Sequence, residues 1–482
     1  MNYIHDIYLG RYGRRLGILA VFLALAGCSL PQLPHRSVAM LQTAHLQAGA
    51  PFDQRSEALI RQWPGPHWWH RLDDAELDHL IGQALSRSPD LQVAQARIRA
   101  AVAQSGIAGA ALKPQMNAAL KPSYNRFTAD EFIPPPFAGH NVWDNQVLLE
   151  GGYELDLWGK NHAALRASLD QVHAQRAESR QVEQVLIASI VDAYLQLRYE
   201  DPSLLRLHEE IELRQQLLRL SQRRRQVGLG TDLELSGVAA ALPPLQRELA
   251  RRSAHQARLR HQLALLCGLP SIALAPPPAT LAAAPTQLAA PGKIPLDWLG
   301  RRPDLMAARW QVEADGEDIH VAKARFYPDI SLSAAIGYQA LGFSQLFSPS
   351  AELYSVSPTI SLPLFEGGRL QAGLDAAAAR RDADIARYNA LLLRAIMQVS
   401  DHMANLQGLQ QEQQAAEQAR NLAQERERLS QSGLQAGLID MSAPLEARIL
   451  RLHSEQALAD LDLRTLQEDV ALIRDTGAGD HE

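Results

Sequence analysis

Two stretches of the chain carry apolar residues in steps of three and four over an unusual length. Residues 160–226 are helical in character, and we expect an interruption only at Pro202, in the segment EDPS. Residues 368–432 repeat the pattern, with apolar positions stepping from Ile385 to Leu406. At 1.5 Å per residue, each helix would be about 100 Å long. Such a rhythm is typical of helices that pack side by side at a shallow angle.

Four shorter segments alternate between apolar and polar residues, which predicts β-strands with one apolar and one polar face. They cover residues 116–127, 142–157, 330–338 and 354–364, and Pro122 weakens the pattern of the first. A soluble β-sandwich gives the same alternation. The strand length, and the Trp or Tyr residues near the strand ends, favour a membrane barrel with a polar interior. The strands also argue against a soluble coiled-coil protein.

Four strands are too few to close a membrane barrel, because such barrels contain at least about eight strands. Open sheet edges are excluded from lipid, since their backbone groups find no hydrogen-bond partner there. If these strands enter a membrane, several chains must therefore contribute to one barrel. Three chains with four strands each would supply twelve strands.

The sequence contains an internal repeat. Pro89 recurs as Pro303, 214 positions later, and Gly228 recurs as Gly437, 209 positions later. Each copy has the same order of helix, two extended segments, very long helix, glycine turn and helix. The predicted organisation is a signal peptide at 1–27, a lipidated N-terminal segment at 28–73, a first repeat at 74–268, a Pro- and Ala-rich linker at 269–295, a second repeat at 296–475 and a C-terminal tail at 476–482.

The first thirty residues resemble a bacterial lipoprotein signal. Their apolar run, residues 16–27, follows three arginines and is too short for a transmembrane helix, which needs about 20 residues. The run ends in Leu-Ala-Gly-Cys, which is similar to the lipobox whose cysteine receives a diacylglycerol. We therefore expect export and acylation at Cys28, and Ser29 after it favours delivery to the outer membrane. The alternative is an ordinary signal peptide that contains a cysteine.

Composition and motifs limit the chemistry that the chain can perform. A net charge of −6 over 482 residues argues against a nucleic-acid partner. The only other cysteine, Cys267, reads as a small core residue, so neither a disulfide nor a zinc site is expected. His67 and His70 flank two tryptophans and read as a packing feature rather than a metal site. No phosphate-binding glycine loop, HExxH or G-x-S-x-G motif is present, so an exported enzyme is not expected.

Each long helix is followed by a glycine turn, QVGLGTDLEL in the first copy and QAGLIDMSAPLEA in the second. Glycine after a helix is the usual left-handed cap. Thr231 or Asp232, and Asp440 or Ser442, are suited to cap the helix that follows. A plain helical hairpin explains one such turn. Two turns at matching positions, each at the end of a very long helix, indicate a shared tip that contacts another protein.

Taken together, these features resemble the TolC/OprM-type outer membrane efflux proteins, specifically their NodT-type lipoprotein branch. The resemblance covers nearly the whole mature chain. It rests on the lipobox, on WPGPHWWHRLDDAELDHLIGQALSRSPDLQVAQARIRAA, on GGYELDLWGKNHAA, on SLPLFEGGRLQAG and on the two glycine turns. The implied fold is mixed α+β and mostly helical. It implies a homotrimer in which a 12-stranded outer membrane β-barrel continues into a long periplasmic α-helical barrel.

The resemblance also implies a function without catalysis. The trimer would passively conduct drugs or other small toxic compounds to the outside of a Gram-negative bacterium. It would receive them from a periplasmic adaptor and an inner-membrane pump of the RND or major-facilitator type. The protein would be anchored in the outer membrane by lipid, palmitate included, on Cys28, with no other cofactor. The alternative is the duct of a type I protein-secretion or metal-efflux system; a periplasmic adaptor is disfavoured because the chain has two hairpins.

Site residues follow from the resemblance only where the motifs coincide. Among acidic ring positions, Glu446 matches, whereas the second position is Ala443 and lacks the charge. Basic partners for a closed-state lock would come from Arg223, Arg224 or Arg225. The implied adaptor-docking residues are Gly228, Leu229, Gly230, Thr231, Gly437 and Leu438, and the implied periplasmic constriction is Asp232, Glu234, Asp440 and Glu446.

Overall fold

The computed structural model describes residues 38–42, 52–53, 65, 67–130, 134–271 and 294–477. The signal peptide and Cys28 lie outside these residues, as does most of the expected linker. Two compact units are present. The first contains described residues of segments 1–40, 97–175 and 308–387, and the second contains those of segments 41–96, 176–307 and 388–482. Each unit therefore draws on both sequence repeats, and the repeats are not separate compact units.

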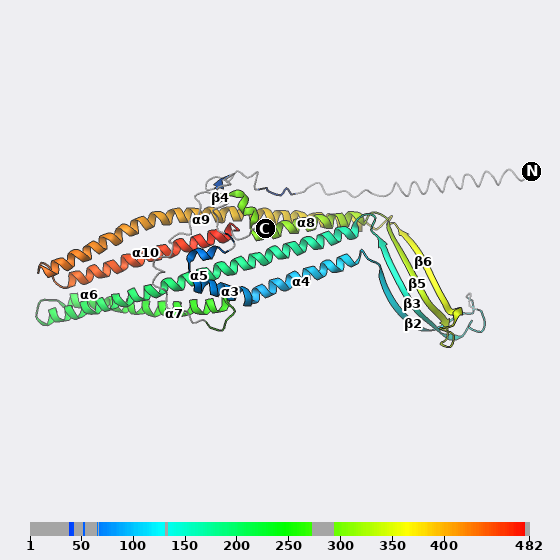
Figure 1. Ribbon diagram of the computed structural model, residues 1–482, viewed down its shortest axis with the longest axis horizontal. Coiled ribbons are helices and arrows are strands. Elements are labelled where there is room, and N and C mark those ends of the chain that lie inside the picture. Colours follow the sequence, from blue (N-terminus) through cyan, green and yellow to red (C-terminus); the bar gives the residue numbers. More distant parts are fainter. Residues whose placement is uncertain are drawn as a thin grey trace, which may run out of the picture. The chain divides into compact units, whose positions relative to one another are not determined.

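Both halves of the chain contain a helix, two strands, a 67-residue helix and a return segment in the same order (Figure 1). A two-stranded parallel pair, β1 and β4, joins the N-terminal segment to the start of the second half. In the first half the elements are β1 Phe52–Asp53, η2 Trp68–Leu72, α3 Ala75–Arg87, α4 Pro89–Ala110, β2 Gln115–Arg126, β3 Asn141–Leu155, α5 Lys160–Gln226, α6 Asp232–Ala240 and α7 Leu242–Leu266. In the second half they are β4 Ile294–Pro295, η4 Leu296–Arg301, α8 Pro303–Ala324, β5 Asp329–Leu341, η5 Pro349–Ala351, β6 Glu352–Ser361, α9 Arg369–Gln435 and α10 Ser442–Asp475.

The long helices α5 and α9 each contain 67 residues; α5 has the predicted bounds, and α9 differs from the predicted 368–432 by one to three residues at its ends. The expected interruption at Pro202 is wrong. Proline lacks the backbone N–H and normally breaks a helix. Here α5 continues through Pro202, and the hydroxyl of Ser203 donates to the carbonyl of Tyr199 at 2.8 Å. The residues just before Pro202 are buried in the main core, so packing holds the helix through the missing hydrogen bond.

The return helix of the first half also differs from the single helix that we expected. It is divided into α6 and α7, which meet at Ala241, whereas α10 in the second half is continuous. Pro243 and Pro244 stand in the first turn of α7. Proline is accommodated there because the first N–H groups of a helix have no partner inside it.

The main core lies in the second unit, where α3, the middle of α5, α7 and the end of α10 bury their apolar faces together. Trp68 and Trp69 pack into this core. Cys267 is fully buried, and its thiol approaches the carbonyl of Leu80 at 3.7 Å. Burial raises the pKa of this thiol to about 11. The prediction of Cys267 as a core residue is confirmed.

The first unit contains one antiparallel sheet with the strand order β2-β3-β5-β6 (Figure 1). All four expected strands are present, and their bounds differ from the predicted ones by one to three residues. The central pair β3–β5 approaches very closely at Gly337. A Cβ atom there would lie 2.0 Å from the carbonyl oxygen of Val147, so only glycine fits.

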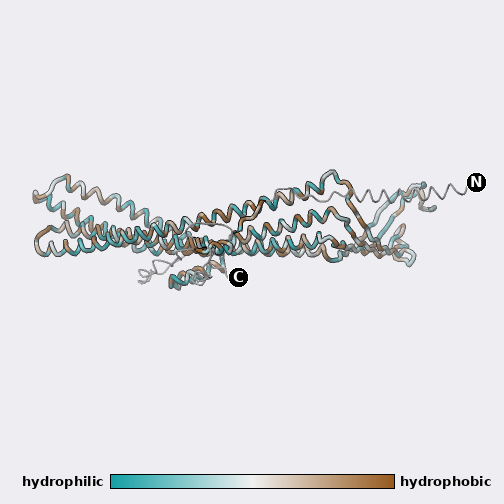
Figure 2. The backbone as a smooth tube through the Cα atoms, turned by 90° about the horizontal axis from the view of Figure 1, so that it is seen from above, coloured by the Kyte–Doolittle hydropathy of each residue, from teal (hydrophilic) through white to brown (hydrophobic). Residues whose placement is uncertain are grey.

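Hydrophobic and hydrophilic residues are interspersed along both long helices (Figure 2). Within the described part of the chain, none of the helices combines the length and the apolar character that crossing a membrane requires.

Candidate functional site

The register of the sheet places the apolar positions of all four strands on one face. Residues that pair directly in an antiparallel sheet point to the same side, so Leu120, Val147 and Tyr338 share a face. This apolar face is largely uncovered in the single chain, since Leu120 is 69% exposed and Tyr354 is 83% exposed. The larger apolar side chains of this face are Met116, Leu120, Tyr124, Trp143, Val147, Leu149, Tyr153, Leu155, Ile330, Leu332, Ile336, Tyr338, Tyr354, Val356 and Ile360.

The opposite face of the sheet, which we call the polar face, carries hydroxyl, amide and charged groups. Lys121 Nζ lies 2.7 Å from Glu150 Oε1 across β2 and β3. Between β3 and β5, the amide of Gln339 donates to Asp144 Oδ1 at 3.2 Å. The face consists mainly of Asn117, Lys121, Ser123, Asn125, Asp144, Gln146, Glu150, Glu154, Asp329, Ser331, Ser333, Gln339, Ser355, Ser357, Thr359 and Ser361.

Both outer strands of this sheet are open on one side. In the described part of the chain, β2 pairs only with β3, and β6 pairs only with β5. The backbone N–H and C=O groups along these two edges therefore have no ladder partner within the sheet. An edge of this kind is a template for pairing with another strand.

Aromatic side chains gather at both ends of the sheet. At one end, the ring of Trp143 lies 5.2 Å from Tyr124 and 5.6 Å from Phe343, measured between ring centroids. Just beyond the other end, Trp158 stacks on Tyr327 with centroids 4.8 Å apart. Girdles of aromatic residues flank the apolar band of membrane barrels in the same way.

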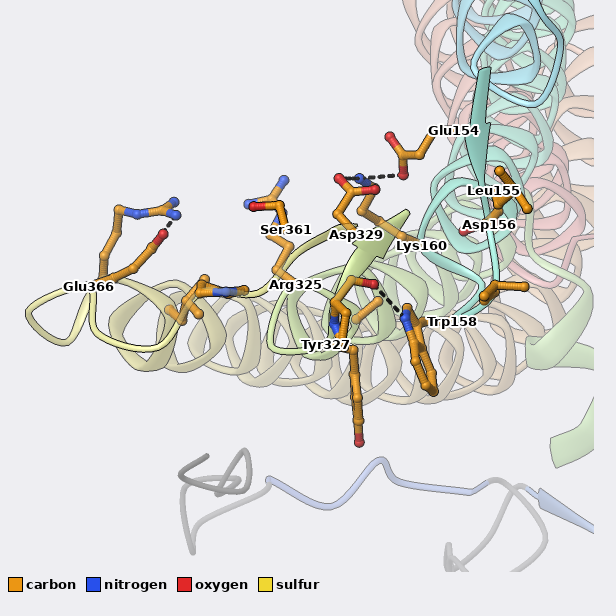
Figure 3. A pocket seen from close by; sticks show the side chains of 16 residues that line it. Glu154, Leu155, Asp156, Trp158, Lys160, Arg325, Tyr327, Asp329, Ser361 and Glu366 are labelled. Atoms are coloured by element: carbon orange, nitrogen blue, oxygen red, sulfur yellow. Dashed lines mark hydrogen bonds and ion pairs between the residues drawn. The ribbon is translucent and has the colours of Figure 1, made fainter. Parts of the chain in front are cut away.

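A cavity of about 200 Å³ lies where the strand ends of the first unit meet α5, α8 and α9. Lys160 lies 2.6 Å from Glu154 and 3.5 Å from Asp329, which neutralises this part of the polar face. Figure 3 shows the Trp158 and Tyr327 rings side by side and directed away from Lys160, and Trp158 Nε1 donates to the Pro328 carbonyl at 2.7 Å. Most of the charged residues that line the cavity thus form ion pairs with one another.

The start of α5 is fixed by a carboxylate in the segment that the sequence resemblance singled out. Asp156 accepts hydrogen bonds from the backbone N–H groups of Asn161 at 3.0 Å and His162 at 2.8 Å. Burial alone would raise the pKa of Asp156, but these bonds and the His162 ring outweigh it and lower the pKa. The motif therefore positions the long helix on the strand before it.

In the second unit, both glycine turns adopt the same Schellman cap. Gly228 has φ +77° and donates to Arg225 O at 3.1 Å, while Leu229 donates to Arg224 O at 2.8 Å. Gly437 has φ +70°, and the following residue, Leu438, closes the matching bond at 2.9 Å. The residue after the glycine of such a cap normally packs on the last helical turn. Here Leu229 is 72% exposed and Leu438 is 79% exposed, so both lie free on the surface of the single chain.

Ion pairs organise the two tips. Arg224, at the end of α5, pairs with Asp440 of the other tip, and Arg225 lies 2.5 Å from Asp232 within its own tip. Asp440 also accepts hydrogen bonds from Ser442. These bonds, with the Arg224 charge, lower the pKa of Asp440.

A family model described as outer membrane efflux protein matches residues 80–269 and 295–478, which is most of the chain. The chain belongs to this family. The predicted family and its mostly helical fold with a four-stranded sheet are confirmed. The narrower NodT-type branch stays a prediction.

Individual members of the outer membrane efflux protein family agree with this assignment. The fusaric acid resistance protein FusA of Burkholderia cepacia is 36% identical over 370 residues, covering 75% of this chain and 68% of FusA. The multidrug resistance outer membrane protein MdtQ of Escherichia coli O157:H7 is 31% identical over 482 residues, covering 95% of this chain and 96% of MdtQ. The solved structure of the outer membrane protein VceC from Vibrio cholerae matches with a TM-score of 0.75 at 31% identity, covering 86% of this chain and all of VceC.

The structure of this efflux protein places the remaining predicted residues near the tips. Thr231 caps α6, and its hydroxyl accepts from the backbone N–H of Glu234 at 3.2 Å in a capping box. Glu446 is exposed on α10, whereas its neighbour Leu445 is buried in a cluster with Leu213 and Leu217 of α5. Ala443, which replaces the second acidic position, is half-buried.

The sequence analysis does not predict two clusters of titratable side chains, each of which contains one buried carboxylate, Asp475 or Asp315. In the second unit, His402 of α9 bridges Glu468 at 2.6 Å and Asp475 at 3.0 Å. Burial opposes the charged ring, but the two carboxylates raise the pKa of His402. In the first unit, burial and the facing carboxylate of Asp384 raise the pKa of Asp315 to about 7. These pairs cannot be predicted from local sequence, because the partners lie 66 or more positions apart and meet only when the helices pack.

His67 and His70 stack with ring centroids 5.3 Å apart, next to the two buried tryptophans. His70 also lies 3.4 Å from Asp78. These contacts agree with the interpretation of the pair as a packing feature.

Proposed function

We propose that three copies of this efflux protein join their sheets into one closed outer membrane barrel. The sheet of a single chain ends in two open edge strands, β2 and β6. These edges support the assembly, because their backbone N–H and C=O groups would find no hydrogen-bond partner in lipid. The uncovered apolar face would contact lipid and the polar face would line a water-filled lumen. Three sheets of four strands give twelve strands.

We propose further that the helices form a periplasmic conduit whose tips dock a periplasmic adaptor. Leu229 and Leu438 support this role, since each directly follows the glycine of its turn and remains largely exposed in the single chain. Burying two leucines on an adaptor would contribute about 3–6 kcal/mol before the costs of association. An inner-membrane pump of the RND or major-facilitator type would supply the energy. The channel itself performs no chemistry.

The transported compounds are proposed to be drugs and other small toxic molecules. The named relatives support this class, since MdtQ is a multidrug resistance protein and FusA confers fusaric acid resistance by name. Acylation of Cys28 would add a lipid anchor to the barrel. Chain stability in the membrane would come mainly from the barrel, because one or two acyl chains give only modest anchoring.

The closed state is proposed to be held by Arg224 and Asp440. This pair ties the tip of the first hairpin to the tip of the second hairpin, whereas the Arg225–Asp232 pair stays within one tip. Opening would separate the two tips, and an adaptor that binds the separated tips more tightly would shift the equilibrium toward the open state.

The test is a deletion strain complemented with the wild-type chain or with a Leu229→Asp, Leu438→Asp variant. We expect the wild-type chain to restore resistance to antibiotics and dyes and to co-purify with the adaptor as a detergent-solubilised trimer. The variant should remain trimeric but lose both adaptor and resistance. Gln222→Asp, an exposed site on α5 outside the tip, is the matched control and should behave as wild type. A monomer that stays in solution without detergent would refute the proposal.

A further inference from the structure

The charges on the polar face are unevenly balanced. Among the described strand residues of this face, the acidic side chains are Asp144, Glu150, Glu154 and Asp329, and the only basic one is Lys121. Lys121 forms an ion pair with Glu150. Lys160, at the start of α5, forms ion pairs with Glu154 and Asp329 beside the cavity. Asp144 is left without a cationic partner among the described residues.

The surroundings of Asp144 are polar but neutral. Gln339 donates to its carboxylate at 3.2 Å, and the hydroxyl of Ser123 donates to its backbone carbonyl at 3.2 Å. Asp144 pairs with Ser123 on one side and Leu341 on the other, close to the C-terminal ends of β2 and β5. Neutral amide and hydroxyl donors hold the carboxylate in place without cancelling its charge.

We propose that Asp144 determines the charge preference of the lumen, so that cationic compounds pass more readily than anionic ones. This inference rests on the proposed function, because one Asp144 from each of three chains would form a ring of three carboxylates around the water-filled interior. A ring of like charge inside a low-dielectric wall concentrates ions of the opposite sign.

The size of the effect follows from Coulomb's law and salt screening. For three charges about 12 Å from the pore axis, removing the ring should lower the permeability ratio of K⁺ over Cl⁻ by about threefold in 0.1 M KCl. The Debye length grows from about 10 Å to about 30 Å in 0.01 M salt, so the change should reach about tenfold there. This growth at low salt distinguishes an electrostatic role from a change in pore width.

The experiment measures K⁺ over Cl⁻ permeability of the full-length protein in planar bilayers under a KCl gradient. Asp144→Asn should lower the ratio as above. Ser123→Lys keeps Asp144 but adds a cation directly opposite it, and it should lower the ratio at least as much. Glu352→Gln removes the same charge from the apolar face, where Glu352 pairs with Tyr338, and should leave the ratio unchanged.

Each outcome decides the inference. A ratio that falls for Asp144→Asn and Ser123→Lys, but not for Glu352→Gln, supports it. If the K⁺ over Cl⁻ permeability ratio is unchanged by both Asp144→Asn and Ser123→Lys, or falls equally for Glu352→Gln, the inference about Asp144 is overturned while the channel function stands. A wild-type protein that opens no pore overturns the proposed function and the inference together.

Discussion

The Arg224–Asp440 pair provides a direct test of the proposed closed-state lock. Arg224→Asp places two carboxylates together where the structure has an ion pair between the two hairpins. Asp440→Arg does the same with two guanidinium groups. The double variant restores an ion pair with the charges exchanged. If the pair acts as a lock, each single variant should favour the open state and the double variant should favour the closed state again.

The expected magnitude is modest because the pair is accessible to water. The Arg224 side chain is 42% exposed and the Asp440 side chain is 51% exposed, and an ion pair at this exposure contributes about 0.5 kcal/mol. Three copies in a symmetric assembly would contribute about 1.5 kcal/mol together, which is roughly a tenfold change in the ratio of closed to open channels. Charge repulsion in the single variants adds to this change.

The assay is single-channel recording in planar bilayers, with the fraction of time in the high-conductance state as the readout. Arg225→Ala is the matched control, because Arg225 pairs with Asp232 inside one tip and does not connect the hairpins. An open fraction that rises equally for Arg225→Ala would show that general loss of positive charge is responsible. A double variant that stays as open as the single variants would refute the pairwise lock.

Three further predictions concern stability. Gly337→Ala should prevent recovery of the proposed trimer in detergent, because its methyl group would meet a β3 carbonyl at 2.0 Å, whereas Gly152→Ala, with open space, should behave as wild type. The folded-state pKa of Asp315, about 7, lies above its ordinary 3.8, so the free energy of unfolding should fall as pH rises from about 4 to 7, and Asp315→Asn should flatten this dependence in urea titrations. His402 has a raised pKa, so its contribution is complete below pH 6.5 and lost above its folded-state pKa. His402→Gln should therefore cost about 2 kcal/mol at pH 6 and less at pH 8, and an equal cost at both would contradict the bridge to Asp475.

Local pattern was sufficient for the strands and for which side chains share a face. Because side chains alternate with a period of two, the alternation within 142–157 and 330–338 places Val147 and Tyr338 at apolar positions of their strands, and the register sets them opposite each other. The long helices were equally readable, since apolar positions in steps of three and four leave little choice of structure. The prediction of a break at Pro202 is wrong because a local rule does not include the packing of the preceding α5 residues in the main core, which outweighs the loss of one hydrogen bond.

Contacts between distant segments cannot be predicted from the sequence pattern. The sequence offers three consecutive arginines before the first glycine turn, and nothing local selects Arg224, whose partner Asp440 lies 216 positions away. The same holds for Gly337, which looks like any glycine in a strand until the adjacent strand is placed against it. The pattern of apolar and polar residues therefore predicts the type of each element and the face on which a side chain lies. Which distant residues contact each other is known only once the helices and strands are packed.

In the single chain, both the sheet and the tips leave groups exposed that another chain could cover. This shared property connects the two proposed roles, barrel formation and adaptor docking. At the sheet, edge hydrogen-bonding groups and an apolar face are unsatisfied, which self-association in a membrane would correct. At the tips, both glycine turns close their cap hydrogen bonds, while the apolar residues Val227, Leu229, Leu233 and Leu438 remain exposed, which suits a partner that can leave again rather than permanent assembly. A surface held by ion pairs that contribute little each, next to apolar residues that contribute more on docking, is suited to a channel that stays closed until its adaptor arrives.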